Sequence, residues 1–304
     1  MPFDSSKTTD SAEQNAVTRF GHLRDRLCGL AVEDRYNPYK IFHWPDSLPQ
    51  DVFWMSPALL SVTGTAAAAE LTQEQLIRLS HWESINFYSL NVHGIRELLG
   101  PIVDRIHTRE FQESSEFFHH FIGEENEHMW FFATFCQRYG GKIYPVVHLR
   151  TEKSDDPEVN NLLIFARILL LEELVDYFNM TMANDNSLPE IVCQVNRIHH
   201  RDESRHVAFG RELVHTLHVA VKRKVTSKTV REIETYLKRY AAFCLQSFYS
   251  PYAYQDAGIP DQFGFRQRVL KDPAREDFHR TVLRRPVGFM IKAGVFEDDK
   301  IEVA

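Results

Sequence analysis

The sequence predicts an all-α protein with a four-helix bundle at its centre. Long segments with helical periodicity occupy most of residues 72–250, and Gly or Pro residues separate one segment from the next. No stretch alternates polar and apolar residues for long enough to indicate a strand. Two short connections and one longer connection join the first four segments, which is typical of a bundle with one crossover.

Capping and stop residues mark the first two bundle helices. Thr72-Gln-Glu-Gln75 is a capping box and Gly100-Pro101 is a stop, so we expect the first helix between them. The second helix is expected over residues 108–139, directly before a pair of glycines. A linker over residues 142–155 should follow.

The next three helices are marked in the same way. The third should begin at Asp156-Pro157, a cap followed by a first-turn proline, and end near residue 184. Ser187-Leu-Pro-Glu190 is another capping box, which predicts a fourth helix that ends at about residue 225. A third box at residues 229–232 predicts a fifth helix, which ends before Pro251.

The ends of the chain are less regular than its centre. Residues 1–16 are expected to form a disordered tail, and residues 17–70 an irregular or short-helical lead-in. Residues 252–304 should contain shorter helices broken at Pro273 and Pro286. We therefore expect residues 17–304 to form a single domain, with a bundle core at about 72–225 and additional N- and C-terminal helices.

The composition is that of a folded, soluble protein with an acidic balance. The 304 residues are 43% hydrophobic and 25% charged, and the formal net charge is -7. Without a basic excess to neutralise phosphates, we expect no nucleic-acid partner. The most apolar run, residues 162–175, carries three charged residues, so we expect no membrane span. The polar N-terminus is no secretory signal, and the four cysteines lack paired spacing, so we expect a reduced cytoplasm.

Glu-x-x-His is the motif most relevant to function. The spacing places a carboxylate and an imidazole one turn apart on one helix face, where both can reach the same metal ion. About one match is expected by chance, so the surroundings must decide which pairs matter. The chain contains five: Glu116/His119, Glu125/His128, Glu203/His206, Glu212/His215 and Glu276/His279.

Two of the five pairs lie on apolar helix faces. The face of Glu125/His128 and the face of Glu203/His206 each continue through bulky apolar residues. These are Phe118, Phe121, Ile122, Met129, Phe132 and Phe135 for the first pair, and Val192, Val195, Val207, Leu213 and Leu217 for the second. Glu116 and Glu212 share their faces with charged residues, and Glu276 lies in the broken C-terminal part. We therefore expect only two pairs in the bundle core.

Buried carboxylates require a compensating cation, because an ionised group without a partner costs several kcal/mol. Two divalent metal ions would supply the charge, and in known bundles each of the other two helices adds one Glu. On the first helix Glu83 and Glu97 compete, and we favour Glu83 because residue counting places it level with Glu125. On the third helix we favour Glu172 over Glu173.

His199 lies one turn before Glu203 on the same face, which gives His-x-x-x-Glu-x-x-His. It could supply a third imidazole, and the competing interpretation is a core histidine bonded to a carbonyl. Glu124 and Asp202 each precede a predicted metal-binding Glu, and could accept the second N–H of the histidine on the facing helix. Imidazole and carboxylate suit iron, manganese and zinc alike, and we favour iron without excluding manganese.

At these residues the chain resembles the p-aminobenzoate N-oxygenase-like non-haem di-iron oxygenases of the ferritin-like superfamily. The similar features are Glu125-x-x-His128, the single Glu172, and His199-x-x-x-Glu203-x-x-His206, over roughly residues 70–215. The extra histidine is that family's distinguishing ligand. The interval from Glu83 to the first motif looks longer than is usual in the family.

The resemblance implies a fold, a reaction and its co-reactants. It implies a ferritin-like bundle that holds two iron ions and activates O2 to oxidise an amine to hydroxylamine, nitroso or nitro in secondary metabolism. Glu125, Glu203 and His199 would take the central catalytic part. The amine would be a small molecule, free or carrier-bound, and electrons would come from an external reductase or ferredoxin. A homodimer is common for such bundles.

Three other classes remain open at this point. Glu124-Glu125 and Asp202-Glu203 also look like the motifs of acyl-carrier-protein desaturases or carbon-hydroxylating di-iron enzymes, although those use one histidine per iron. A non-catalytic ferritin-like iron protein would favour a shorter chain. A ribonucleotide reductase small subunit needs a tyrosine beside the metals, and Tyr177 lies on another side of its helix from Glu172.

Overall fold

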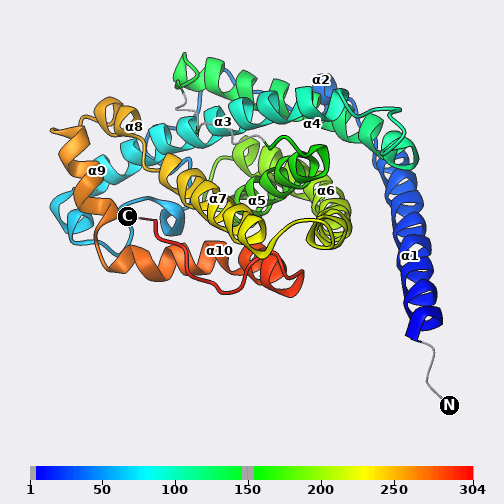
Figure 1. Ribbon diagram of the computed structural model, residues 1–304. Helices are drawn as coiled ribbons and strands as arrows, with labels where there is room; N and C mark the ends of the chain where they lie inside the picture. The colour runs from blue at the N-terminus through cyan, green and yellow to red at the C-terminus, as the bar shows by residue number, and fades with distance from the viewer. Residues whose placement is uncertain (1–4, 146–148, 150–153, 304) are drawn as a thin grey trace.

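The computed structural model describes residues 5–145, 149 and 154–303, with side chains from residue 18 onward. Within these ranges every regular element is a helix (Figure 1). Four long helices form the centre: α3 (Gln73–Val103), α4 (Ser115–Phe135), α5 (Pro157–Ala183) and α6 (Glu190–Lys222). α3 packs against α4 and α5 against α6, while contacts between α3 and α5 and between α4 and α6 join the two pairs. The predicted all-α bundle is confirmed.

Several predicted helix starts agree with the structure and two do not. Thr72 and Gln75 form the capping box before α3, and Asp156 caps α5 by accepting from Glu158 N. α6 begins after Pro189, because Ser187 bonds to Asp185 and makes no cap. α7 (Ser227–Ser247) is capped by Thr226, three residues earlier than predicted. At α7 the neighbouring Thr226 takes the capping role, whereas no side chain caps α6.

The connection between α3 and α4 is longer than the sequence suggested. α4 begins at Ser115, not at residue 108, because Ser115 Oγ accepts a hydrogen bond from His107 N and holds the chain in a turn. At its other end α4 passes into a π-turn (Cys136–Gly140) and stops at Gly141, whose φ of 65° is left-handed. This stop was predicted from the two glycines.

Two prolines lie inside helices that were predicted to end or break there. α3 continues through Pro101 for two residues, where only the last turn loses a hydrogen bond. α10 (Ala274–Lys292) continues through Pro286, which is buried together with Val282, Leu283 and Val287. The packing of this apolar face holds the helix together across the missing donor. Pro273 does mark the start of α10, as predicted.

The lead-in contains a long helix that was not predicted. α1 (Ser5–Glu33) includes residues 5–16, and its N-terminal half extends away from the body (Figure 1). A helix satisfies its own backbone hydrogen bonds, so a polar segment can be helical without being buried. The C-terminal half packs on α4 and α6, with the rings of Phe20 and Phe209 5.3 Å apart.

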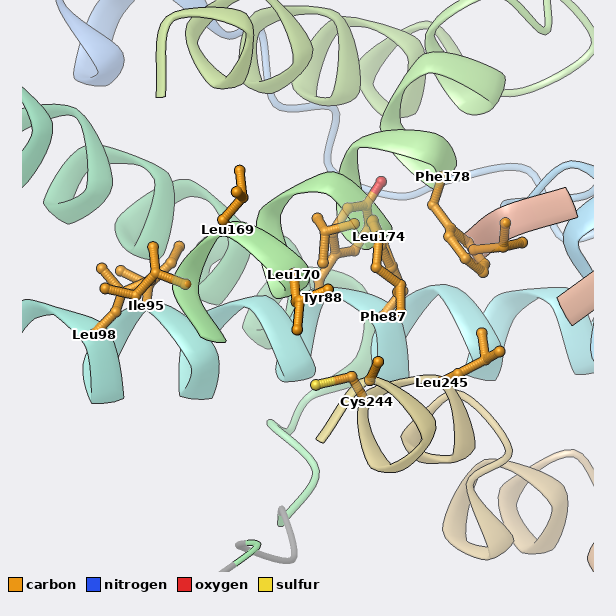
Figure 2. Packing of buried hydrophobic residues seen from close by; sticks show 14 of the residues in the cluster. Phe87, Tyr88, Ile95, Leu98, Leu169, Leu170, Leu174, Phe178, Cys244 and Leu245 are labelled. Atoms are coloured by element: carbon orange, nitrogen blue, oxygen red, sulfur yellow. The ribbon is translucent and has the colours of Figure 1, made fainter. Parts of the chain in front are cut away.

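Shorter elements complete the lead-in and the C-terminal part. α2 (Pro38–Ile41) and the 3-10 turns Pro57–Leu59 and Ala66–Glu70 follow α1, as expected for a short-helical lead-in. α7 covers α5, α8 (Pro251–Asp256) packs against α3, and α9 (Gln262–Leu270) packs against α8 and the Ala66–Glu70 turn. Figure 2 shows buried side chains from α3, α5 and α7 meeting in one core. No helix of the described residues is long and apolar enough to cross a membrane.

Arg275 anchors α10 to the body. Its side chain is 1% exposed and donates to Tyr249 Oη at 2.8 Å and to the backbone carbonyl of Thr63 at 2.9 Å. Tyr249 in turn lies 2.6 Å from His279 Nε2. Burial and the nearby guanidinium lower the pKa of His279 to about 4.

We predict that His279 makes the protein less stable in mild acid. Its pKa is about 4 when folded and 6.5 as the reference for the unfolded chain, so protons bind preferentially to the unfolded state between these values. The free energy of unfolding should fall as the pH drops from 6.5 to about 4, and His279→Gln should reduce this fall. Urea unfolding at pH 7 and pH 5 measures it. The exposed His43→Gln is the control, and equal pH dependence in all three proteins would contradict the prediction.

Candidate metal centre

Six buried side chains from three bundle helices converge at the centre of the protein. Glu125 and His128 come from α4, Glu172 from α5, and His199, Glu203 and His206 from α6. They form two groups that share Glu203, and within each group one ligand atom per residue lies within 4.8 Å of the others. The groups are Glu125, Glu172, Glu203 and His206, and His128, His199 and Glu203.

Helical spacing and the close approach of α4 to α6 create this geometry. His206 Nδ1 on α6 lies 2.9 Å from Glu125 Oε1 on α4. Glu203 turns Oε1 toward His199 Nε2 at 2.8 Å, and Oε2 toward His206 Nδ1 at 3.6 Å. Its two oxygens therefore face different groups, as a carboxylate that bridges two metal ions would.

Each of the six residues presents a buried polar atom without a hydrogen-bond partner to the shared space. His206 Nδ1 and Glu125 Oε1 are 2.9 Å apart, but a neutral His206 that donates through Nε2–H to Glu124 has no hydrogen on Nδ1 to share. Leaving such atoms unpartnered costs about 1–3 kcal/mol each, so a folded protein rarely collects six of them in one place. The atoms are Glu125 Oε1, His128 Nδ1, Glu172 Oε1, His199 Nε2, Glu203 Oε2 and His206 Nδ1. The donors are oxygen and nitrogen atoms that suit a divalent metal, so the residues fit a metal pair.

The electrostatics also favour positive charge at the centre. Burial, together with the charges of Glu203 and Glu125, raises the pKa of Glu172 well above its ordinary value. Burial acts in the same direction on Glu203, but His199 and His206 outweigh it and hold the pKa of Glu203 well below its ordinary value. Three carboxylates this close can all be ionised only if positive charge lies among them.

Two outer carboxylates orient the histidines. His206 Nε2–H donates to Glu124 at 2.8 Å, and His128 Nε2–H donates to Asp202 at 3.1 Å. These contacts between each carboxylate and the histidine on the facing helix confirm the expectation from sequence, and they leave Nδ1 of both histidines directed at the shared space. Arg205 Nη2 donates to Glu124 and to Asp202, at 2.7 Å each, and so ties α4 to α6.

Further partners on either side complete the outer layer. Tyr36, before α2, donates to Asp202 at 3.1 Å. Asn179 on α5 meets His199 Nδ1 at 2.5 Å through its amide nitrogen, while its amide oxygen has no partner. For Nε2 to offer a lone pair, Nδ1 must carry the hydrogen, so metal binding requires this amide to turn over and accept it. No sequence pattern marks Tyr36, Asn179 or Arg205, because each meets the histidines or their carboxylates only once the chain is folded.

The structure does not bring Glu83 to the centre, and this corrects the prediction. Glu83 accepts hydrogen bonds from the backbone and side chain of Ser61, and burial raises its pKa to about 7. Residue counting assumed that the second helix begins at residue 108. The real connection extends from 104 to 114, so the residues of α3 that are level with Glu125 lie about three turns after Glu83, near residue 95.

The fold also keeps Glu97, Glu173 and Tyr177 out of the cluster. Glu97 lines a cavity of about 80 Å³ between α3, α5 and α7, away from the six residues. Glu173 forms a two-point ion pair with Arg211, at 2.9 and 2.5 Å, while Glu172 faces the centre. The ring of Tyr177 lies among those of two phenylalanines, at 178 and 278. Glu172 is thus the member of the cluster in preference to Glu173.

The remaining Glu-x-x-His pairs lie where the sequence patterns placed them. Glu116 and His119 are exposed, and Glu212 pairs with Arg19 at 3.0 Å on the surface. Glu276 is exposed and its partner His279 is turned inward to Tyr249. A third possible grouping of Cys28, Glu116 and His120 is partly exposed, and exposed groups of this kind are common without an ion.

Comparison with known proteins decides between the di-metal classes. Residues 21–294 match the family described as P-aminobenzoate N-oxygenase AurF. The chain belongs to this family. Among curated proteins nothing matches. The p-aminobenzoate N-oxygenase family consists of di-metal oxygenases, so the chain is an oxygenase with a dinuclear metal site, and the resemblance found in the sequence is confirmed.

One solved structure confirms the fold. A mutant of R2-like ligand-binding oxidase with an aerobically reconstituted Mn/Fe cofactor is similar, with a TM-score of 0.52 at 14% identity. The match covers 91% of this chain and 93% of that chain. A second mutant of the same oxidase, with anaerobically reconstituted Mn/Fe, has 15% identity, the same coverage and a TM-score of 0.45. The first match shows that the bundle of this N-oxygenase family member is ferritin-like.

We predict that metal binding depends on the core pairs and not on the surface pair of the same helix. Glu203→Ala and His206→Ala each remove a donor from the centre, so metal retained after desalting should fall to a small fraction of the wild-type amount. Glu212→Ala and His215→Ala are matched controls nine residues further along α6. Plasma emission spectrometry gives the metal content. Wild-type retention in Glu203→Ala would contradict the assignment.

We predict a smaller effect at Asp202. Asp202→Asn weakens the acceptor that orients His128, and metal affinity should fall about 10–100-fold, as is typical for outer-layer partners. A chelator competition assay measures the affinity, and circular dichroism checks the fold. Asp176→Asn is the control, because Asp176 makes a similar contact with His200, at 2.5 Å, outside the cluster. Equal affinities in the two variants would show that Asp202 does not tune the metal.

Proposed function

We propose that this protein is a di-iron N-oxygenase that oxidises the nitrogen of a small-molecule amine. Membership of the p-aminobenzoate N-oxygenase family supports the reaction class. The observation that carries the proposal is the donor set itself, in which His199 adds a third imidazole to two Glu-x-x-His pairs. Desaturases have one histidine per metal, so this set favours N-oxygenation over their chemistry.

The metal pair would be iron, which activates O2 when bound by mixed nitrogen and oxygen donors with an open position. Glu203 would hold both ions, because it belongs to both groups, and Glu125 would hold the ion beside His206. Glu172 would complete one ion and His199 the other. Manganese binds the same donors, so the metal is tested directly by reconstitution.

The reaction needs an electron donor that the chain does not carry. Conversion of R–NH2 to R–NHOH consumes one O2, two electrons and two protons, and releases one water. The sequence has no Gly-x-Gly-x-x-Gly motif after a strand, so it shows no nucleotide-binding domain of its own. A separate reductase or a ferredoxin would therefore supply the electrons.

Aromatic side chains would protect the reaction from water. The rings of Phe121 and His206 lie 4.4 Å apart, and those of Phe132 and His199 lie 4.7 Å apart. Both phenylalanines are at most 5% exposed. Closing the site in this way strengthens the interactions that bind the metals and limits side reactions with solvent.

The proposal is tested by turnover of the reconstituted protein. Iron-loaded protein is mixed with a chemical reductant, O2 and p-aminobenzoate or another arylamine, and the products are identified by mass spectrometry. Hydroxylamine, nitroso or nitro products are expected from the iron form and from Glu212→Ala, and none from Glu203→Ala. Manganese-loaded protein tests the metal.

Other products would contradict the proposal in specific ways. A ring-hydroxylated product would move the protein to carbon hydroxylation. Desaturation of a carrier-bound acyl chain, with arylamines unchanged, would favour a desaturase. Oxidation of iron without any organic product would favour an iron protein without oxygenase turnover.

A further inference from the structure

The helix α3 contributes no carboxylate to the metal centre. In di-metal carboxylate bundles each of the two helices without Glu-x-x-His adds one Glu. Here α5 does so with Glu172, but the acidic residues of α3 are Glu74, Glu83 and Glu97. Glu74 is exposed in the first turn, and the other two lie in the separate surroundings described above. All of α3 is described, so its inventory is complete.

Tyr88 shows which part of α3 is level with the cluster. Its ring stacks on Phe132 at 5.3 Å, and its hydroxyl accepts from Asn196 Nδ2 at 2.7 Å. Phe132 lies one turn after His128 on α4, and Asn196 lies about one turn before His199 on α6. Tyr88 is therefore one helical turn away from being level with His128 on α4 and with His199 on α6.

The next turn of α3 places Asn91 level with His128 and His199. α4 runs opposite to α3, because Cys136 contacts Ile85 while Phe132 contacts Tyr88. The residues one turn after Tyr88 on α3 must then face His128 and His199. Asn91 and Ile95 follow Tyr88 by three and seven residues, which places them on its face, and each is 5% exposed. Asn91, whose amide nitrogen donates to Phe87 O at 2.8 Å, and Ile95 thus lie on the part of α3 that is level with the histidines, and neither offers a carboxylate.

The two metal positions consequently differ in charge. Glu172 belongs only to the four-donor position, which consists of Glu125, Glu172, Glu203 and His206. The three-donor position (His128, His199 and Glu203) has only one carboxylate, Glu203, and Glu203 also belongs to the four-donor position. With two divalent ions, three carboxylates and neutral histidines, the centre would keep a net charge of +1. This excess positive charge would lie at the three-donor position.

We propose that Asn91 replaces the α3 carboxylate, so that this chain binds its two metal ions unequally, tightly at the four-donor position and weakly beside Asn91. The inference rests on the di-metal site of the proposed function, but concerns only the affinities of its two positions. His199 then serves to hold the weak ion, because it supplies the donor that α3 lacks. The difference in affinity should be at least about tenfold, the lower end of the effect of outer-layer partners.

Metal titration tests the inference without any turnover. Metal-free protein is titrated anaerobically with Fe²⁺ and separately with Mn²⁺, and the metal retained after gel filtration is counted. We expect about one ion per chain to be retained by the wild type, and a second to bind only with free metal in excess. Asn91→Asp adds the missing carboxylate and should raise retention toward two ions.

The controls separate this effect from a general change of charge. Asn86→Asp places a carboxylate on another face of α3, where Asn86 donates to Ser247 O at 3.2 Å, and should leave retention at one ion. Asn91→Leu should retain one ion as well, since the four-donor position is untouched. Thermal unfolding of each variant identifies any that fails to fold.

Three results would overturn the inference. The first is two ions bound with equal affinity by the wild type, which needs no variant to fold. The second is unchanged retention in a folded Asn91→Asp protein. The third is retention of no metal, which would remove the di-metal basis of the proposed function too. A failure to oxidise amines by protein with unequal metal sites would instead contradict only the proposed function.

Discussion

The charge of three buried carboxylates is the constraint on which the rest of the structure depends. Glu125, Glu172 and Glu203 lie together with almost no access to water, where their mutual repulsion would destabilise the fold. The unpartnered atoms of six side chains all face the space between them, so a metal pair resolves both problems at once. Burial of this kind is tolerated because binding energy becomes folding energy.

Around this centre the protein builds a layer of fixed charges. Glu124 and Asp202 hold two histidines by Nε2, and the single guanidinium of Arg205 binds both carboxylates. Asp34, at the end of α1, also accepts from Arg205 at 3.0 Å. The lead-in is therefore part of the support of the metal centre, and it closes the side of the bundle formed by α4 and α6.

The pairs on α4 and α6 could be predicted because their evidence is local. Glu125/His128 and Glu203/His206 lie on apolar faces, whereas Glu116 and Glu212 lie on charged ones, and helical periodicity carries that distinction in the sequence alone. Glu172 could be preferred to Glu173 for the same reason. Glu83 could not be excluded in this way, because its level depends on where α4 begins, and a turn held by Ser115 moved that start by seven residues.

The sequence by itself determined the helical class and which faces of α4, α5 and α6 look inward, since both follow from spacing within one helix, and its motifs on three helices carried the resemblance to the family. Only the tertiary structure decided what α3 offers, which histidine nitrogen faces the metals, and how Tyr36, Asn179 and Arg205 support them. These features depend on the register between helices. That register is set by loop geometry and by packing between residues distant in sequence, neither of which is encoded in any local pattern.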